Sequence, residues 1–211
     1  MENKYIDIFK NIEEFLENNK KNDTKLSKKF PFRKRSDHIW RVFVWTVRLL
    51  DQIKNDTINK NVIFIAALFH DVGYGISEDS KNHAENSVII FENYCKKLDL
   101  NKEEENLIKF LIKNHSNKKV MEDKNIPIEL TILMEADLLD ETGAMSIVWD
   151  CMAEGSEEEQ NFQKTYEHIK KNSCKILEQN PMKTQIGKEI WEKKQKLVKE
   201  FSEQLFFDLC K

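Results

Sequence analysis

Two ionisable residues, His70 and Asp71, stand directly after a wholly apolar segment of the chain. Residues 62–69 (VIFIAALF) carry no charge and are apolar on every side, which predicts a helix buried in the centre of the protein. An imidazole and a carboxylate are costly to bury at its end unless a partner satisfies both. Divalent ions such as Mn²⁺, Fe²⁺ and Zn²⁺ accept mixed imidazole and carboxylate ligands, so the pair predicts a metal site.

Asp137 is a second carboxylate in apolar surroundings. It lies in the segment ILMEADLLD, with apolar residues on both sides. A charged group in such a segment needs a cation or several hydrogen-bond donors. We therefore expect Asp137 and His38 to bind the same ion as the His–Asp pair, with positions left open for water as in catalytic metal sites. Asp140 follows three residues after Asp137 and can share its helical face.

Helices are the elements expected to position these residues. The chain has only 5 glycines and 3 prolines, and strand-like alternation between turn signals is absent from the sequence. Apolar residues instead recur at intervals of three and four, which predicts an all-α fold, a single-domain helical bundle. Helices are expected over residues 5–16, 36–53, 59–69, 82–98, 103–115 and 127–139, with three more after residue 145. Signals for helix starts are Ser36 or Asp37, the pair Asn82 and Glu85 as a capping box, and Pro127.

The composition is that of a globular chain. The net charge of the 211 residues is only −3, which argues against a surface built to grip nucleic acid. No apolar stretch approaches the roughly 20 residues that cross a bilayer, and the charged start is unlike a signal peptide. Four scattered cysteines form no CxxC pair, and this pattern fits reduced thiols. We expect a cytoplasmic protein that binds neither membranes nor specific nucleic acids.

The arginines of the chain are clustered. All four, Arg33, Arg35, Arg41 and Arg48, fall within sixteen residues, and lysine is used everywhere else. The planar guanidinium matches phosphate oxygens in a way that an ammonium cannot. The stretch 20–35 also carries eight basic residues against one acid. It is either a solvated connector or an electropositive rim for a phosphorylated ligand, and the arginine cluster favours the second interpretation.

The order His38, His70–Asp71 and Asp137 resembles the HD-domain superfamily of metal-dependent phosphohydrolases. The segments DHIWRV, AALFHDVGYG and EADLLDETGAMSI resemble its first-histidine helix, its HD segment and its distal aspartate segment. The resemblance implies an all-α core over residues 30–155 with a central metal site, preceded by a helix and basic connector (1–29) and followed by packed C-terminal helices (156–211). It also implies hydrolysis of a phosphate ester or phosphoanhydride of a small metabolite or nucleotide.

Two further histidines lie in segments that resemble family positions. His83, in NHAENS, is expected to begin a helix, and His115, in IKNHS, to end one. In members with two metals, histidines in these regions help to hold the second ion, whereas members with one metal use equivalents for phosphate or protons. The expected cofactor is therefore one or two divalent transition-metal ions, with Mn, Fe, Co, Ni and Zn all open. His168 falls outside the pattern and is expected at the surface.

The resemblance implies metal-assisted hydrolysis of the small phosphorylated substrate. The ion lowers the pKa of bound water and polarises a phosphoryl oxygen. Asp71 or Asp140 is expected to accept the proton of that water. Arg41, one turn beyond the first histidine, is expected to bind the phosphate with help from Arg33 or Arg35.

Two other functions are compatible with the same residues. Some proteins of this fold hold two irons and oxidise their substrates with O₂, and such a site would use six ligands: His38, His70, Asp71, His83, His115 and Asp137. A non-catalytic nucleotide-binding sensor is the other alternative, although degenerate members are expected to lose a ligand and none is missing here. The sequence leaves the identity of the substrate and the oligomeric state open.

Overall fold

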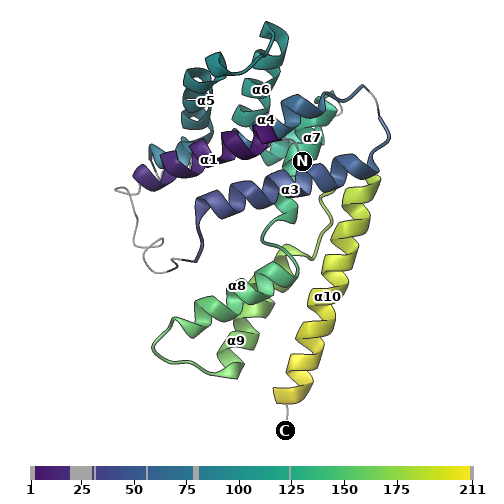
Figure 1. Ribbon diagram of the computed structural model, residues 1–211. Coiled ribbons are helices and arrows are strands. Elements are labelled where there is room, and N and C mark those ends of the chain that lie inside the picture. Colours follow the sequence, from purple (N-terminus) through teal and green to yellow (C-terminus); the bar gives the residue numbers. More distant parts are fainter. Residues whose placement is uncertain are drawn as a thin grey trace. The chain divides into compact units, whose positions relative to one another are not determined.

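A computed structural model describes residues 3–19, 30, 32–55, 57–77, 81–123 and 125–209 (Figure 1). Every regular element in these ranges is a helix or helical turn, and they contain no strand, so the prediction of an all-α fold is confirmed. The chain divides into two compact units, Met1–Asp137 and Leu138–Lys211. The sequence instead predicts boundaries between parts of the chain after residues 29 and 155, and these boundaries stay a prediction.

The first unit is organised around the apolar helix. Helix α4 contacts α1, α3, α5 and α6 (Figure 1). Its residues Ile63, Ala66 and Leu68 are completely buried, as expected for a helix that is apolar on every side. The helices of this unit are α1 (Asn3–Asn18), α3 (Arg35–Gln52), α4 (Lys60–Phe69), α5 (His83–Tyr94), α6 (Lys102–Asn114) and α7 (Ile128–Leu139), whose last two residues belong to the second unit. Its short helical turns are η2 (Val72–Gly75), η3 (Cys95–Lys97) and η4 (Lys118–Glu122).

The expected helices are present, but two expected caps are not. Helix α3 begins at Arg35 after an extended Lys34, so Ser36 and Asp37 lie inside its first turn and cannot cap it. Asn82 does precede α5, but its backbone is not extended (φ −110°, ψ 1°) and its side chain makes no capping bond. An N-cap side chain reaches the first turn from an extended backbone, which explains the missing capping box. A complete capping box stands instead before α6.

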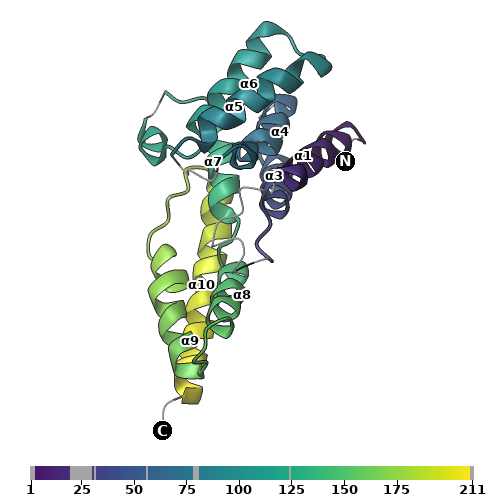
Figure 2. The same ribbon diagram turned by 90° about the vertical axis from the view of Figure 1, so that its left-hand side faces the viewer.

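The second unit contains the three helices expected after residue 145. Helix α8 (Ala144–Gly155) is followed by α9 (Phe162–Ile169), a π-helical turn (Lys170–Cys174) and α10 (Gln185–Leu209). The three helices contact one another (Figure 2). Ile169, Trp191 and Val198 are buried between them and form the core of this unit.

His168 is expected at the surface, and the structure leaves it only partly exposed. Its side chain is 30% exposed, and it lies between two carboxylates of α8. Nδ1 is 2.5 Å from Glu154 Oε1, and Nε2 is 3.3 Å from Asp150 Oδ1. The Ser173 hydroxyl donates to the other oxygen of Asp150, whose pKa is raised by burial. The imidazole therefore ties α9 to α8, and the signal missed in the sequence is the acid pair one turn apart on α8.

We predict that His168→Ala destabilises the second unit by about 1–3 kcal/mol, because Glu154 would lose its hydrogen-bond partner and the buried Asp150 its nearby imidazole. The change should appear as a lower midpoint of urea unfolding. Lys164→Ala on the same helix is the control, since its ion pair with Glu159 is exposed and should contribute little. An equal midpoint for the two variants would contradict a structural role for His168.

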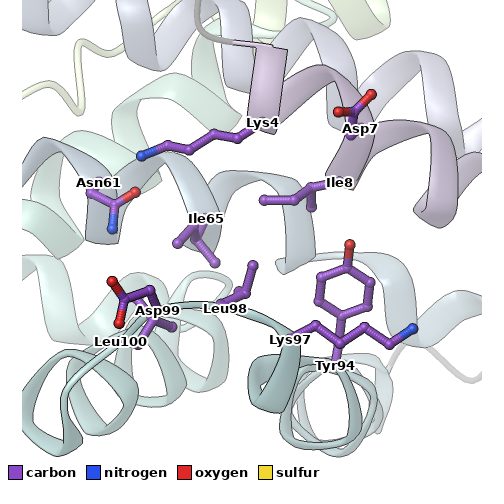
Figure 3. Close-up of a pocket in the computed structure, with 10 residues that line it drawn as sticks. All are labelled: Lys4, Asp7, Ile8, Asn61, Ile65, Tyr94, Lys97, Leu98, Asp99 and Leu100. Carbon is purple, nitrogen blue, oxygen red and sulfur yellow. The ribbon is translucent and has the colours of Figure 1, made fainter.

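A recess of about 290 Å³ lies in the first unit, lined by α1, α4 and the segment around η3 (Figure 3). Ile8 and Ile65 form buried parts of its wall, whereas Lys4, Lys97 and Asp99 on its border are exposed. None of the residues expected to bind metal or phosphate lines it. Among the described residues, no helix combines the length and apolar character needed to cross a membrane.

Candidate metal centre

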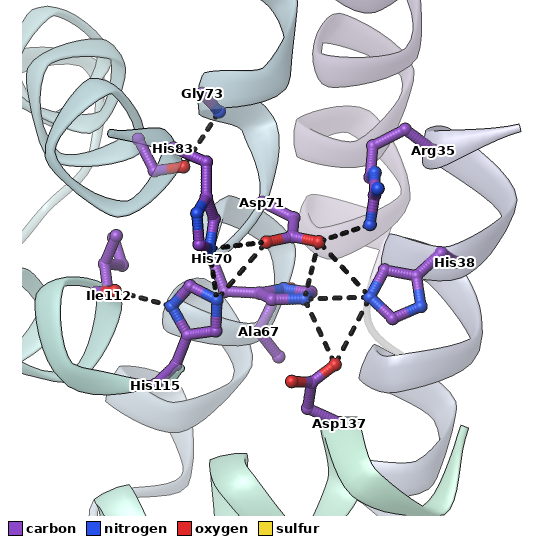
Figure 4. A network of polar contacts seen from close by, with 11 residues as sticks. Arg35, His38, Ala67, His70, Asp71, Gly73, His83, Ile112, His115 and Asp137 are labelled. Atoms are coloured by element: carbon purple, nitrogen blue, oxygen red, sulfur yellow. Dashed lines mark hydrogen bonds and ion pairs between the residues drawn. The ribbon is translucent and has the colours of Figure 1, made fainter. Parts of the chain in front are cut away.

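Histidines from four helix ends surround Asp71 in the first unit (Figure 4). Two stand at helix starts, in the first turn of α3 and at the first position of α5. Two stand directly after helices, at the C-caps of α4 and α6. Asp137 lies near the end of α7. The structure thus brings together six residues singled out in the sequence: His38, His70, Asp71, His83, His115 and Asp137.

His70 and His115 are held by the same local geometry. Nδ1 of His70 lies 2.8 Å from the carbonyl oxygen of Ala67, and Nδ1 of His115 lies 2.7 Å from that of Ile112. The last carbonyls of a helix lack helical partners, so each ring satisfies one of them. Because a carbonyl only accepts, Nδ1 must carry the hydrogen, and the lone pair of each neutral ring is on Nε2. This is the tautomer of a histidine that binds metal through Nε2.

Gly73 allows the start of α5 to approach the HD segment. A Cβ atom at this position would collide with the backbone oxygen of His83 and the backbone nitrogen of Ser87. The Gly73 N–H donates to Ser87 Oγ at 2.8 Å, which fixes the approach. His83 is therefore placed beside Asp71 because residue 73 has no side chain.

The two oxygens of Asp71 face two different pairs of imidazoles. Oδ2 lies 3.4 Å from Nε2 of His38 and 3.7 Å from Nε2 of His70. Oδ1 lies 3.4 Å from Nε2 of His83 and 3.2 Å from Nε2 of His115. Within the pairs the Nε2 atoms are 3.3 and 3.2 Å apart. Asp71 therefore belongs to two groups of three donors, each able to surround one ion.

These contacts fit a divalent transition metal. Lone pairs of imidazole nitrogens and carboxylate oxygens repel one another at such distances unless a proton or a metal ion lies between them. Mixed imidazole and carboxylate donors suit Mn, Fe, Co, Ni and Zn better than Ca or Mg, whose preferred ligands are oxygens. Both groups of donors are largely buried, so water can do little to reduce the repulsion.

Asp137 extends the first donor group. Its Oδ1 lies 3.3 Å from Nε2 of His38 and 3.9 Å from Nε2 of His70. Burial would raise the pKa of this carboxyl, but the hydrogen bond to His38 and the attraction of both imidazoles lower it. The side chain keeps 28% of its surface exposed, so this edge of the cluster is open to solvent.

The charges of His70 and Asp71 suit metal ligands. Burial lowers the pKa of His70 to about 4, and the attraction of Asp71 only partly opposes this, so His70 is neutral at neutral pH. Burial would also raise the pKa of Asp71, but His70, Arg35 and two further imidazoles hold it well below its usual range. Burial opposes protonation of His115 too, yet the hydrogen bond and attraction to Asp71 raise its pKa. A neutral imidazole and an ionised carboxylate are the forms that bind metals.

The arginines differ in their places. Arg35 reaches the cluster directly, with Nη1 2.7 Å from Asp71 Oδ2 and a side chain that is 34% exposed. Arg33 is exposed, and Arg41 is half-buried one turn beyond His38 on α3. Their binding of phosphate stays a prediction. Most of the basic stretch, residues 20–29 and 31, lies outside the described residues.

Asp140 follows directly after α7, in the second unit, and its expected role as proton acceptor stays a prediction.

Tyr74 was not singled out in the sequence, although its ring stacks on His83 and lies beside the guanidinium of Arg35. The available signal was an aromatic residue three positions after Asp71, in the turn that follows the HD pair.

The family of the chain follows from a sequence match over this cluster. A family model of the HD domain matches residues 35–142, slightly more than half of the chain. The chain belongs to the HD-domain family. The match confirms the resemblance and contains all six residues of the cluster. A comparison with curated proteins found no match.

Solved structures show the same fold. Bacillus subtilis YpgQ is 20% identical, with 97% of both chains covered and a TM-score of 0.63. YpgQ in complex with ADP is 22% identical over 82% of this chain and 88% of that chain, with a TM-score of 0.59. An HD-superfamily hydrolase from Bacillus thuringiensis is 21% identical over 94% of this chain and 96% of that chain, with a TM-score of 0.63. At these identities the likeness establishes the fold of the HD domain.

We predict that His70 and His115 differ in protonation at about pH 5.5 in the metal-free protein. His70 should be neutral because its pKa is lowered to about 4, whereas His115 should be protonated because its pKa is raised above 6.5. The ¹⁵N chemical shifts of the ring nitrogens distinguish the two states. The denatured protein is the control, since both imidazoles should then have a pKa of about 6.5. A protonated His70 in the folded protein would contradict its buried, neutral state.

Proposed function

We propose that this protein is a metal-dependent phosphohydrolase that cleaves a phosphate ester or phosphoanhydride of a small metabolite or nucleotide. The observation that carries the proposal is the single carboxylate of Asp71 facing two pairs of imidazoles. Membership of the HD-domain family supports hydrolytic chemistry. The likeness in fold to YpgQ, whose structure is known with ADP, supports a nucleotide as the class of substrate.

The proposed site has two parts that share Asp71. The first would hold one divalent ion through His38, His70, Asp71 and Asp137. The second, formed by His83 and His115 with the other oxygen of Asp71, would hold a second ion or a phosphate oxygen. A bound ion supplies Lewis acidity and lowers the pKa of water.

The two proposed proton acceptors are not equivalent. A carboxylate with a low pKa is a weak base, and the surrounding imidazoles together with Arg35 keep the pKa of Asp71 well below its usual range. Asp71 is therefore better suited to binding and orienting the ions. Asp140, three residues beyond Asp137, is the proposed acceptor of the proton from the attacking water.

Arg35 has donors left for a phosphoryl group. A guanidinium offers five N–H donors, and the bond to Asp71 involves only Nη1. The side chain is 34% exposed, so a ligand can approach it from solvent. Arg41 and Arg33, from the same region of the chain, complete the proposed set of phosphate-binding cations. Such charges stabilise the phosphoryl oxygens in the transition state.

The proposal is tested by elemental analysis of the purified protein and by a screen for phosphate release. Nucleotides and sugar phosphates are assayed with Mn²⁺ added. His70→Ala should lose the bound metal and all detectable phosphate release, because the buried Nε2 ligand is removed. Asp99→Asn, which changes an exposed aspartate outside the cluster, should retain both. Full metal occupancy in His70→Ala would contradict the assigned ligands.

We also predict that Arg41→Lys lowers kcat/KM by about tenfold or more, because lysine keeps the charge but loses the planar fork. Metal content and melting temperature should not change. Arg48→Lys is the matched control, since Arg48 lies on the same helix, is exposed and stacks on Trp45. Identical kinetics for the two variants would show that Arg41 does not bind the substrate.

A second candidate function uses the same cluster. The two groups of three donors that share Asp71 would also suit a pair of irons in an oxygenase. The metal content and O₂ consumption distinguish the two functions. Two irons per chain together with substrate-dependent O₂ consumption would favour the oxygenase, and phosphate release without O₂ consumption would favour the hydrolase.

A further inference from the structure

The ring of Tyr74 contacts both a cation and an imidazole of the cluster. The Cζ atom of Arg35 lies 4.1 Å from the centroid of the Tyr74 ring. The ring of His83 stacks on Tyr74 with centroids 4.8 Å apart and planes 19° from parallel. Tyr74 therefore contacts two groups that come from different helices, α3 and α5.

Both neighbours of Tyr74 approach the same carboxylate. Arg35 contacts Asp71 Oδ2 at 2.7 Å, and His83 lies 3.4 Å from Asp71 Oδ1. Tyr74 is itself tied to this residue, since its backbone N–H donates to the Asp71 carbonyl at 3.2 Å. One ring thus stands beside the groups that flank both oxygens of Asp71.

Arg35 depends on few contacts. Within the part of the chain that the structure describes, its guanidinium has the ion pair with Asp71 and the contact with the face of Tyr74. A long arginine side chain loses rotamer entropy when it is fixed in one position. The cation–π contact with Tyr74 offsets part of that cost. Without the ring, the guanidinium could rotate about its one bond to Asp71.

We propose that Tyr74 is a positioning residue that fixes the guanidinium of Arg35 for binding the phosphoryl group of the substrate. The proposal rests on the proposed function, because it assumes that Arg35 binds phosphate. The face of the aromatic ring is the part that acts, so the hydroxyl is dispensable. Tyr74 does not itself contact the reacting atoms in this proposal.

Affinity for inorganic phosphate, measured by calorimetry on the Mn²⁺-loaded protein, tests the proposal without any substrate. Tyr74→Met keeps an apolar side chain but removes the π face, and should weaken phosphate binding by about tenfold. Tyr74→Phe keeps the face and should bind within about twofold of the wild type. Tyr74→Leu replaces the methionine variant if that variant does not fold, as judged by melting temperature.

A double-mutant cycle then shows whether Tyr74 acts through Arg35. Arg35→Ala should weaken phosphate binding, and adding Tyr74→Met should cause no further loss, because no guanidinium remains to be positioned. Additive losses would overturn the proposal. A phenylalanine variant as weak as the methionine variant would also overturn it.

Metal content separates this role from an effect through His83. If Tyr74 served mainly to support His83, Tyr74→Met would lower the number of bound ions per chain, and that result would overturn the proposal. We expect unchanged metal content. A wild-type protein that does not bind phosphate would overturn it as well. Absence of phosphate release from every substrate, with phosphate binding and the cycle as expected, would remove the proposed hydrolysis but leave the role of Tyr74 intact.

Discussion

The carboxylate of Asp71 is the group on which the arrangement of the first unit depends. It is nearly buried, and imidazole nitrogens approach both of its oxygens. Lone pairs cannot be held together in a buried site unless cations or protons lie between them. The single arginine at 2.7 Å balances only one side of the carboxylate. The fold therefore crowds lone pairs and a negative charge around Asp71, and a divalent ion would stabilise this arrangement better than the side chains alone.

Helix ends place the imidazoles around Asp71 in two ways. Helices α4 and α6 end in histidines whose Nδ1 atoms bond the last carbonyls, so the rings cap the helices and present Nε2 to Asp71. Helices α3 and α5 place histidines in their first turns. The apolar helix α4 supports the site because its packing on four neighbours fixes the position of the His–Asp pair. The helix ends that are fixed by packing therefore also carry the residues of the site.

The sequence predicted much of this and failed where tertiary contacts decide. Apolar spacing located the helices because it is a local pattern, and the resemblance to the HD domain pointed to the residues of the cluster, which are far apart in the sequence. The caps at Ser36 and Asn82 were wrong because backbone dihedrals, not residue types, determine whether a side chain can cap. His168 and Tyr74 were missed for a different reason. Their partners come from other helices, so the available signals, an acid pair on α8 and an aromatic residue after the HD pair, do not show which side chains meet.

Four of the five residues of the segment HDVGY, residues 70–74, contribute to the site. His70 ends α4 and satisfies a helix carbonyl, while Asp71 serves both donor groups. Gly73 admits the start of α5, which brings His83 to Asp71. Tyr74 then stacks on that same imidazole and reaches back to Arg35 at the start of α3. Because these residues are adjacent in the chain, one short segment connects three helices at the site. Changes at His70 or Asp71 would therefore remove proposed metal ligands, whereas a change at Tyr74 would act through Arg35 and leave those ligands in place.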